Sequence, residues 1–296
     1  MNDEELEKWI LAGKIGKEIR EYSSALVKPG VKIIDIAKSV DARFLEYKAR
    51  PAFPINISVN NIAAHYHPIK DDGSVLKIGD IVKIDVGASI DGYLSDTAAT
   101  VLVGGGDNSL IKTSKEALDA VIDSIKPGME IDKISSLIED MIRKNGLKPI
   151  VNLGGHGIGR YNLHAYDFIP NVNQNTHKNL IKEGVIAVEP FVTDGVGYVI
   201  DDANVNILML DHYKPVRDVN ARKVLEFIKN EYHELPFARR WIDETFGPIS
   251  EYALRLLVSM GILYEFHVLK EESGANVAQF EHTILFHDGE VIVTTL

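Results

Sequence analysis

Two aspartates, Asp85 and Asp96, lie in residues 83–98, which read KIDVGASIDGYLSDTA. Runs that alternate between apolar and polar residues flank Asp91-Gly92, a turn signal typical of a β-hairpin. Whether the two-residue loop is Ile90-Asp91 or Asp91-Gly92, both carboxylates fall on one face, because side chains alternate along a strand. Their Cβ atoms would lie roughly 5 to 8 Å apart. Carboxylates so close repel each other unless a cation lies between them, although a solvated hairpin fits the isolated stretch equally well.

Three further residues of metal-binding type lie in apolar strands or glycine-rich turns. His156 stands between two glycines, Glu189 in the segment VEPF, and Glu281 in the segment QFEHT. Acidic residues are rarely buried unless they are paired or bind a metal. Taken singly, each has an ordinary interpretation: a satisfied core histidine, a residue at the end of a strand, and the polar face of an edge strand.

Together, these five residues suit a site for two metal ions. Four carboxylates balance two divalent cations, and carboxylates can bridge metals about 3.5 to 4 Å apart. An oxygen-rich set with one imidazole favours Mn(II), Fe(II) or Co(II), and Zn(II) also fits. The chain contains no cysteine, which excludes a thiolate site.

The elements that must position these residues follow a plan that occurs twice, in residues 4–103 and 107–208. Each part has a helix, Lys-Pro-Gly, a second helix, a histidine in an irregular strand, and a Lys-x-Gly turn before a strand that ends in a carboxylate, Asp85 or Glu189. We interpret the pattern as two α+β halves related by a pseudo-twofold axis, with the site between them and Gly104-Gly105-Gly106 as the hinge. The predicted helices span 4–26, 32–48, 108–125, 130–145, 221–232, 239–246 and 250–260, and the predicted strands include 55–59, 149–153, 277–286 and 290–295.

Residues 211–270 break this plan. Helical patterns separated by Pro215, Pro236 and Pro248 indicate a compact helical insertion. The predicted domains are therefore a catalytic domain, residues 1–210 and 271–296, and an insertion subdomain, residues 211–270.

Composition narrows the class of protein. The 296 residues are 45% hydrophobic, enough for a large core, and the formal net charge of -11 argues against a nucleic-acid backbone as the main partner. No apolar run approaches the roughly 18 residues needed to span a membrane. The acidic start MNDEELEKW lacks a signal-peptide core, so we expect a cytoplasmic protein.

Seven segments surround the candidate residues and carry a resemblance. They are AFP at 52–54, AAHYHP at 63–68, KIDVG at 83–87, SDT at 95–97, GHGIGRYNLHA at 155–165, VEPF at 188–191 and AQFEHT at 278–283. In combination they resemble the type II methionine aminopeptidases in their short archaeal form, and the resemblance covers essentially the whole chain. It implies the pita-bread fold with a winged-helix-like helical insertion. The chain departs from the family at His67, usually threonine, where we expect little effect, and at Phe266, often tyrosine.

The resemblance also implies roles for the five candidate ligands. Asp85 would chelate one of two divalent metal ions (Co, Mn, Fe or Zn), and Asp96 and Glu281 would bridge both. His156 and Glu189 would complete the shell of the second ion. A hydroxide bridging the metals would attack the first peptide bond, and Glu189 would carry the proton to the leaving amine.

Two more histidines and three apolar residues complete the implied active site. His65 and His164 would hydrogen-bond the scissile peptide and the developing oxyanion. By the same resemblance, spiro-epoxides of the fumagillin type are expected to alkylate His65. Phe53, Leu163 and Phe266 would surround the methionine side chain, although ordinary core packing would also explain them.

The implied function is removal of the N-terminal methionine from nascent polypeptides. The expected partners are those polypeptides and possible contacts with the ribosome, and we expect a monomer that binds neither a membrane nor nucleic acid directly. A proline-directed peptidase of this fold is an alternative, but such enzymes usually carry an N-terminal domain. A non-catalytic relative that binds nucleic acid or the ribosome is a second alternative, but such relatives have lost metal ligands.

Overall fold

The computed structural model describes all of residues 1–296 and contains seven helices and eighteen strands. The helices agree with the periodicity predicted from the sequence to within a few residues at each end. None of them combines the length and the apolar character that spanning a membrane requires. They are α1 (Asp3–Ala25), α2 (Ile33–Tyr47), α3 (Ser109–Ile122), α4 (Ile131–Lys144), α5 (Val219–Tyr232), α6 (Arg239–Phe246) and α7 (Ile249–Ser259).

The strands form five sheets of three to five strands. Three sheets have three strands each, in the spatial orders β2 (Asn56–Val59), β4 (Ile81–Val86) and β7 (Thr97–Leu102); β1 (Arg50–Pro51), β5 (Ala88–Ile90) and β6 (Tyr93–Leu94); and β16 (Val277–Gln279), β12 (Phe191–Thr193) and β8 (Lys148–Pro149). The largest sheet has the order β10 (Phe168–Pro170), β9 (Gly154–Ile158), β11 (Gly184–Val188), β17 (His282–His287) and β18 (Glu290–Val293). The last sheet has the order β14 (Phe237–Ala238), β13 (Val199–Leu210), β15 (Leu263–Glu271) and β3 (Ile62–Ala64).

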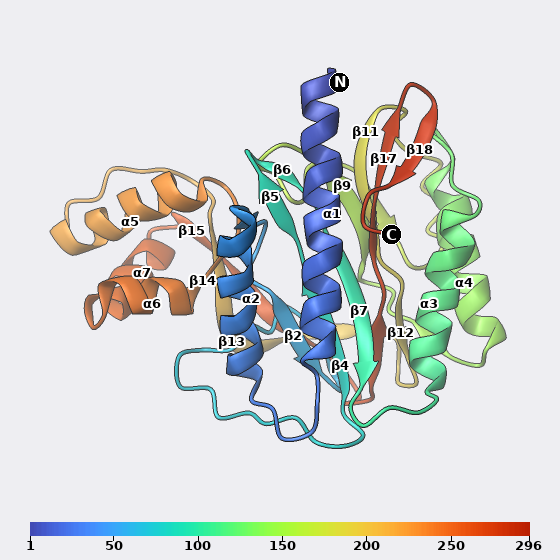
Figure 1. Ribbon diagram of the computed structural model, residues 1–296, viewed down its shortest axis with the longest axis horizontal. Coiled ribbons are helices and arrows are strands. Elements are labelled where there is room, and N and C mark those ends of the chain that lie inside the picture. The colour runs from blue at the N-terminus through green and yellow to red at the C-terminus, as the bar shows by residue number, and fades with distance from the viewer.

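The first half packs α1 and α2 against β2, β4 and β7 (Figure 1). Helix α1 begins with a capping box, in which Asn2 and Glu5 exchange side-chain to main-chain hydrogen bonds. Helix α2 ends at Lys48, whose left-handed φ of 53° stops further helical bonding. The apolar faces of both helices are buried against the sheet in one cluster of seventeen residues, which fixes β4 beneath them.

The second half repeats this arrangement with α3 and α4 against residues of β10, β11 and β17 and of the neighbouring strands β12 and β16. In each half a carboxylate lies at the end of the central strand: Asp85 near the end of β4, and Glu189 directly after β11. A second carboxylate lies directly before the strand that pairs with this central strand: Asp96 before β7, and Glu281 before β17. The halves meet where Ala98 and Glu281 exchange two main-chain hydrogen bonds. The predicted α+β fold of two halves with the same order of elements is confirmed, with the C-terminal strands completing the second half.

The hairpin around Asp91-Gly92 shows how its two aspartates come together. Both loop residues have positive φ, 52° and 84°, as the tight turn between β5 and β6 requires. The register pairs Asp85 with Ala98, so Asp96 lies two residues away, diagonal to Asp85 on the same face. The strands are interrupted at Gly87 and at Ser95-Asp96. Position 87 requires glycine, because a Cβ atom there would lie 2.0 Å from the main-chain oxygen of Ser95.

The helical insertion forms a separate group of elements beside α2, on the side of the molecule away from α3 and α4 (Figure 1). Helices α5, α6 and α7 enclose their own hydrophobic core, which includes Leu225, Ile242 and Leu257. The end of the predicted insertion differs from the expectation, because residues 263–271 form β15 and pair along β13 and with β3. This strand ties the insertion to the rest of the molecule, and the proposed domain boundary at residue 271 stays a prediction.

Two further strand predictions need correction. The predicted strand 277–286 is interrupted at Phe280 and Glu281, because Glu281 leaves its own sheet to bridge to Ala98 of the first half. Of the predicted strand 149–153 only Pro149 is in a strand, and the extended segment that carries His156 is β9.

Candidate metal centre

A cavity of about 440 Å³ opens between the two halves and β15. All ten residues singled out from the sequence line it, although they come from seven separate parts of the chain. They are Phe53, His65, Asp85, Asp96, His156, Leu163, His164, Glu189, Phe266 and Glu281.

Asp96, His156 and Glu281 form the centre of the cavity. Each offers one ligand atom, and the three atoms all lie within 4.8 Å of one another. The Nε2 atom of His156 is 3.5 Å from Oδ2 of Asp96 and 3.8 Å from Oε1 of Glu189. Thr283 holds the main chain of Asp96 at 2.7 and 2.6 Å, by accepting from its N–H and donating to its carbonyl. The two halves therefore deliver their polar side chains to one point.

The carboxylates of this group are strongly perturbed. Burial, followed by the charge of Asp96, raises the pKa of Asp85, Glu189 and Glu281 well above the usual range. The Oδ1 atom of Asp85 and the Oε1 atom of Glu281 are buried without a hydrogen-bonding partner. Buried charged oxygens without donors need a counter-charge. Divalent cations fit this set, since their preferred ligands are carboxylate oxygens and imidazole nitrogens.

His65 lies at one wall of the cavity in a left-handed conformation, with φ of 64°. Its Nδ1 atom is 3.0 Å from the main-chain oxygen of His267 on β15. A carbonyl only accepts, so Nδ1 carries the proton and Nε2 keeps a lone pair. Burial lowers the pKa of His65, which favours the neutral ring. Its ring also makes an edge contact with Phe266, with centroids 5.4 Å apart.

His164 also lines the cavity, and its ring centroid is 4.4 Å from that of His156 and 6.3 Å from that of Phe266. The residue as a whole is exposed, but burial of its ring within the protein lowers its pKa. The charges of His156 and His65 lower that pKa further. It makes no hydrogen bond within the protein, so both of its tautomers are available. Phe53 and Leu163 are buried in one apolar cluster at the cavity wall.

Three supporting residues were not identified from the sequence. Gln279 is buried and donates from Nε2 to Glu189 at 3.0 Å and to Glu281 at 3.5 Å. Lys83 is buried, and its Nζ atom donates to the main-chain oxygens of Asn60 and Val277, which ties β4 to β16. The signals available in the sequence were the two-residue spacings of Lys83 from Asp85 and of Gln279 from Glu281, which place each pair on one strand face. Thr283 has the same two-residue spacing from Glu281, but its contact with Asp96 of the other half could not be inferred from that spacing.

Comparisons with known proteins agree with this geometry. Residues 7–288 match the model of metallopeptidase family M24. A methionine aminopeptidase from Pyrococcus abyssi is 47% identical over 98% of this chain and 99% of its own length. Among solved structures, a methionine aminopeptidase from Thermotoga maritima is 25% identical, covers 100% of this chain and 98% of its own, and has a TM-score of 0.72. A thermophilic Arx1 has a TM-score of 0.88 and covers 99% of this chain and 91% of its own, but at 18% identity it shows the fold alone.

The membership inferred from the seven sequence segments is thereby confirmed, as is the α+β fold that it implies. A family match across residues 7–288 and close relatives that align over nearly their full length leave no large part of the chain unaccounted for. This chain belongs to metallopeptidase family M24.

Proposed function

We propose that this protein removes the N-terminal methionine from polypeptides by metal-dependent hydrolysis of the first peptide bond. The observation that carries the proposal is the cavity in which His156 and four carboxylates, two of them buried and two half-buried, meet two histidines whose pKa values are lowered by burial. The relatives named methionine aminopeptidase support the substrate class. The alternative of a non-catalytic relative is not favoured, because the acidic cluster and both histidines are retained.

The residues that would hold the metals are Asp85, Asp96, His156, Glu189 and Glu281. Asp96 and Glu281 are the candidates for bridging two ions, since they lie where the halves meet. The ions, of Co(II), Mn(II), Fe(II) or Zn(II), would supply Lewis acidity and lower the pKa of a water molecule into the neutral range.

The other steps fall to side chains of the chain itself. Glu189, whose pKa is raised first by burial, suits transfer of a proton to the leaving amine. His65 presents an unprotonated Nε2 and therefore suits acceptance of a hydrogen bond from the scissile N–H. His164 is free to donate, so it is the better candidate to stabilise the developing oxyanion. This assignment divides between the two histidines the roles that the sequence left shared.

The methionine side chain is proposed to lie against Phe53, Leu163 and Phe266. All three line the cavity, and two are buried in the wall next to the polar centre. An unbranched thioether packs well against aromatic rings. Cytoplasmic location, a monomeric state and association with the ribosome stay predictions from the sequence.

The direct test is release of methionine from short peptides by the purified protein, loaded separately with each of the four metals. We expect release from peptides with a free N-terminus and none from the same peptides after N-terminal acetylation. Bound metal without release of any N-terminal residue would support the non-catalytic alternative instead.

A further inference from the structure

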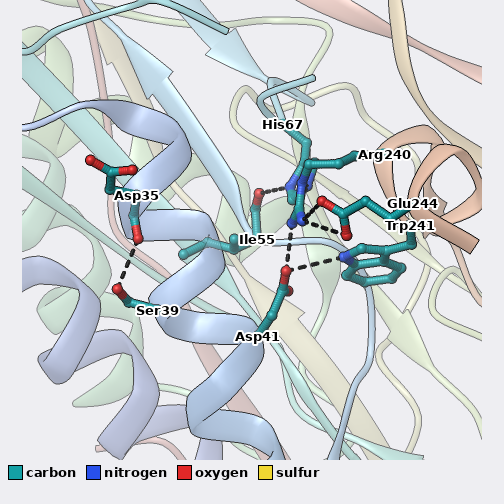
Figure 2. Close-up of polar contacts among 8 residues, drawn as sticks. All are labelled: Asp35, Ser39, Asp41, Ile55, His67, Arg240, Trp241 and Glu244. Atoms are coloured by element: carbon teal, nitrogen blue, oxygen red, sulfur yellow. Dashed lines mark hydrogen bonds and ion pairs between the residues drawn. The ribbon is translucent and has the colours of Figure 1, made fainter. Parts of the chain in front are cut away.

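Arg240 is a buried cation outside the metal centre, and its partners connect three parts of the molecule (Figure 2). It lies on α6 in the helical insertion, and its side chain is only 2% exposed. Its Nη2 atom donates to Asp41 on α2 at 2.5 Å, and its Nη1 atom donates to Glu244 at 3.1 Å. Trp241 donates to the same carboxylate oxygen of Asp41 at 3.2 Å. We call Arg240, Asp41, His67, Trp241 and Glu244 the Arg240 cluster.

The fifth member, His67, receives two contacts from the guanidinium. Its Nε2 atom lies 3.2 Å from Nη2 and 3.4 Å from Nε of Arg240. Its Nδ1 atom lies 2.8 Å from the main-chain oxygen of Ile55. Since a carbonyl only accepts and a guanidinium only donates, His67 is fixed as the neutral tautomer with its proton on Nδ1. His67 is completely buried, so neither nitrogen has water as a substitute partner.

His67 is two residues from His65, and two main-chain oxygens of residues 65–67 are held by hydrogen bonds. The main-chain oxygen of Tyr66 accepts from the N–H of Ile57 at 2.7 Å, and that of His67 accepts from Nδ2 of Asn206 at 2.9 Å. His65 itself has φ of 64°. A residue other than glycine keeps such a conformation only when its surroundings enforce it. His65 therefore holds a left-handed conformation next to a residue, His67, that is anchored on both ring nitrogens.

We propose that Arg240, acting through His67, is a positioning residue for His65, so that the helical insertion sets the orientation of that imidazole in the cavity. The insertion holds the segment twice: α6 binds His67 through Arg240, and β15 binds Nδ1 of His65 through the main chain of His267. The inference rests on the proposed function for its kinetic consequences, but its structural content concerns the protein alone.

Removing the guanidinium has a defined physical result. The Nε2 atom of His67 and the carboxylate of Asp41 would each lose a charged donor in a largely dry environment. The segment could then relax toward an ordinary conformation, and His65 would turn away from its place in the cavity. A displacement of about 1 Å at a catalytic group can lower the rate about a hundredfold.

The test compares Arg240→Met with Arg239→Met, its neighbour on α6. Arg239 pairs with Glu251 on α7 and does not contact His67, so the control removes an equal side chain from the same helix. In the metal-free protein, nitrogen-15 spectra of labelled imidazoles report whether His65 keeps its proton on Nδ1. We expect Arg240→Met to lose or shift that signal, and Arg239→Met to retain it. An unchanged His65 signal in Arg240→Met would overturn the proposal.

Kinetics on the metal-loaded protein provide the second readout. We expect kcat to fall roughly ten- to a hundredfold in Arg240→Met, with unchanged metal content and a smaller change in KM. His67→Leu should give a similar loss, and the double variant should lose little more, because both act through one contact. Additive losses would overturn the proposal. If Arg240→Met fails to fold, Arg240→Lys, which keeps the charge near Asp41 but lacks the fork toward His67, takes its place.

The two arms separate this inference from the proposed function. If the wild-type protein releases no methionine, the proposed function fails, and the spectra of the metal-free variants still decide whether Arg240 positions His65. If the wild-type protein is active and the nitrogen-15 signal of His65 is the same in Arg240→Met as in the wild type, only the positioning role of Arg240 is rejected.

Discussion

The Nδ1 atom of His65 lies 3.0 Å from the main-chain oxygen of His267, a residue two hundred positions further along the chain. This bond fixes the proton on Nδ1 and leaves the Nε2 lone pair free. The insertion thus reaches the active site through its last strand, β15, as well as through α6. The chemistry of His65 as an acceptor or a nucleophile follows from this one contact.

His65 should therefore be the residue that reacts with an epoxide of the fumagillin type. Burial lowers the pKa of its imidazole, so the ring is neutral and nucleophilic near pH 7. We expect His65→Ala to block covalent labelling, to retain bound metal, and to lower kcat by about a hundredfold, because the scissile peptide would lose a positioning contact. Intact-protein mass spectrometry is the measurement. His164→Ala is the matched control and should still be labelled; an adduct that persists in His65→Ala would contradict the assignment.

Loss of a bridging carboxylate should remove metal as well as activity. Asp96 and Glu281 lie where the two halves meet, and the unpaired Oε1 atom of Glu281 has no other partner. We expect Asp96→Asn and Glu281→Gln to abolish turnover and to lower the metal content measured by elemental analysis. Asp140→Asn, an exposed change on α4, should alter neither. Full metal content with near-normal turnover in either bridging variant would refute a dinuclear site.

Asp132 gives a pH-dependent contribution to stability away from the site. Main-chain donation from His177, then from Thr176, lowers its pKa below the usual value. A lowered pKa means that the contribution is present above the unfolded pKa of about 3.9 and is lost as pH falls through the folded value. We expect Asp132→Asn to lower the unfolding temperature at pH 7 and to converge with wild type below about pH 4. Asp35→Asn, in the first turn of α2, is the matched control, because the Asp35 carboxylate accepts no hydrogen bond within the protein.

Local patterns allowed the sequence to predict much of the fold. The helices follow from apolar positions at helical spacing, and the Asp91-Gly92 turn follows from residues that tolerate positive φ. The five carboxylate and histidine positions could be grouped because each is unusual within an apolar strand. To predict that these residues meet in one cavity, the repeated order of elements in the two halves was also needed, because it places equivalent strand ends together.

What the sequence did not reveal depends on contacts between distant residues. Strand β15 was assigned to a helical insertion, because its strand character arises from pairing with β13 and β3. His67 was expected to matter little, since it is no ligand, but it is fully buried against Arg240, 173 positions away. Local periodicity carries no information about such distant partners, so the buried polar network around His67 could not be identified from the sequence.

The methionine pocket can be tested through Phe53, which is buried at the cavity wall next to Leu163. Phe53→Ala would remove a ring that the substrate side chain is proposed to contact. A change of one methylene in an apolar pocket is worth about tenfold or more in kcat/KM, so loss of a whole ring should cost at least that much for methionine peptides. The loss should appear mainly in KM, because the ring contributes to binding in both the ground state and the transition state. Metal content should not change.

Phe44→Ala separates this effect from simple destabilisation. Phe44 is a buried phenylalanine in the core between α2 and the first sheet, and it does not line the cavity. Its loss should lower the free energy of unfolding by about 3 to 5 kcal/mol without changing the preference for methionine over leucine at the N-terminus. The preference should fall only in Phe53→Ala. Phe53 also packs on Gly87, which lies between Asp85 and Asp96 in the hairpin. If Phe53→Ala and Phe44→Ala showed the same preference for methionine over leucine, the ring of Phe53 would support the hairpin and not the substrate.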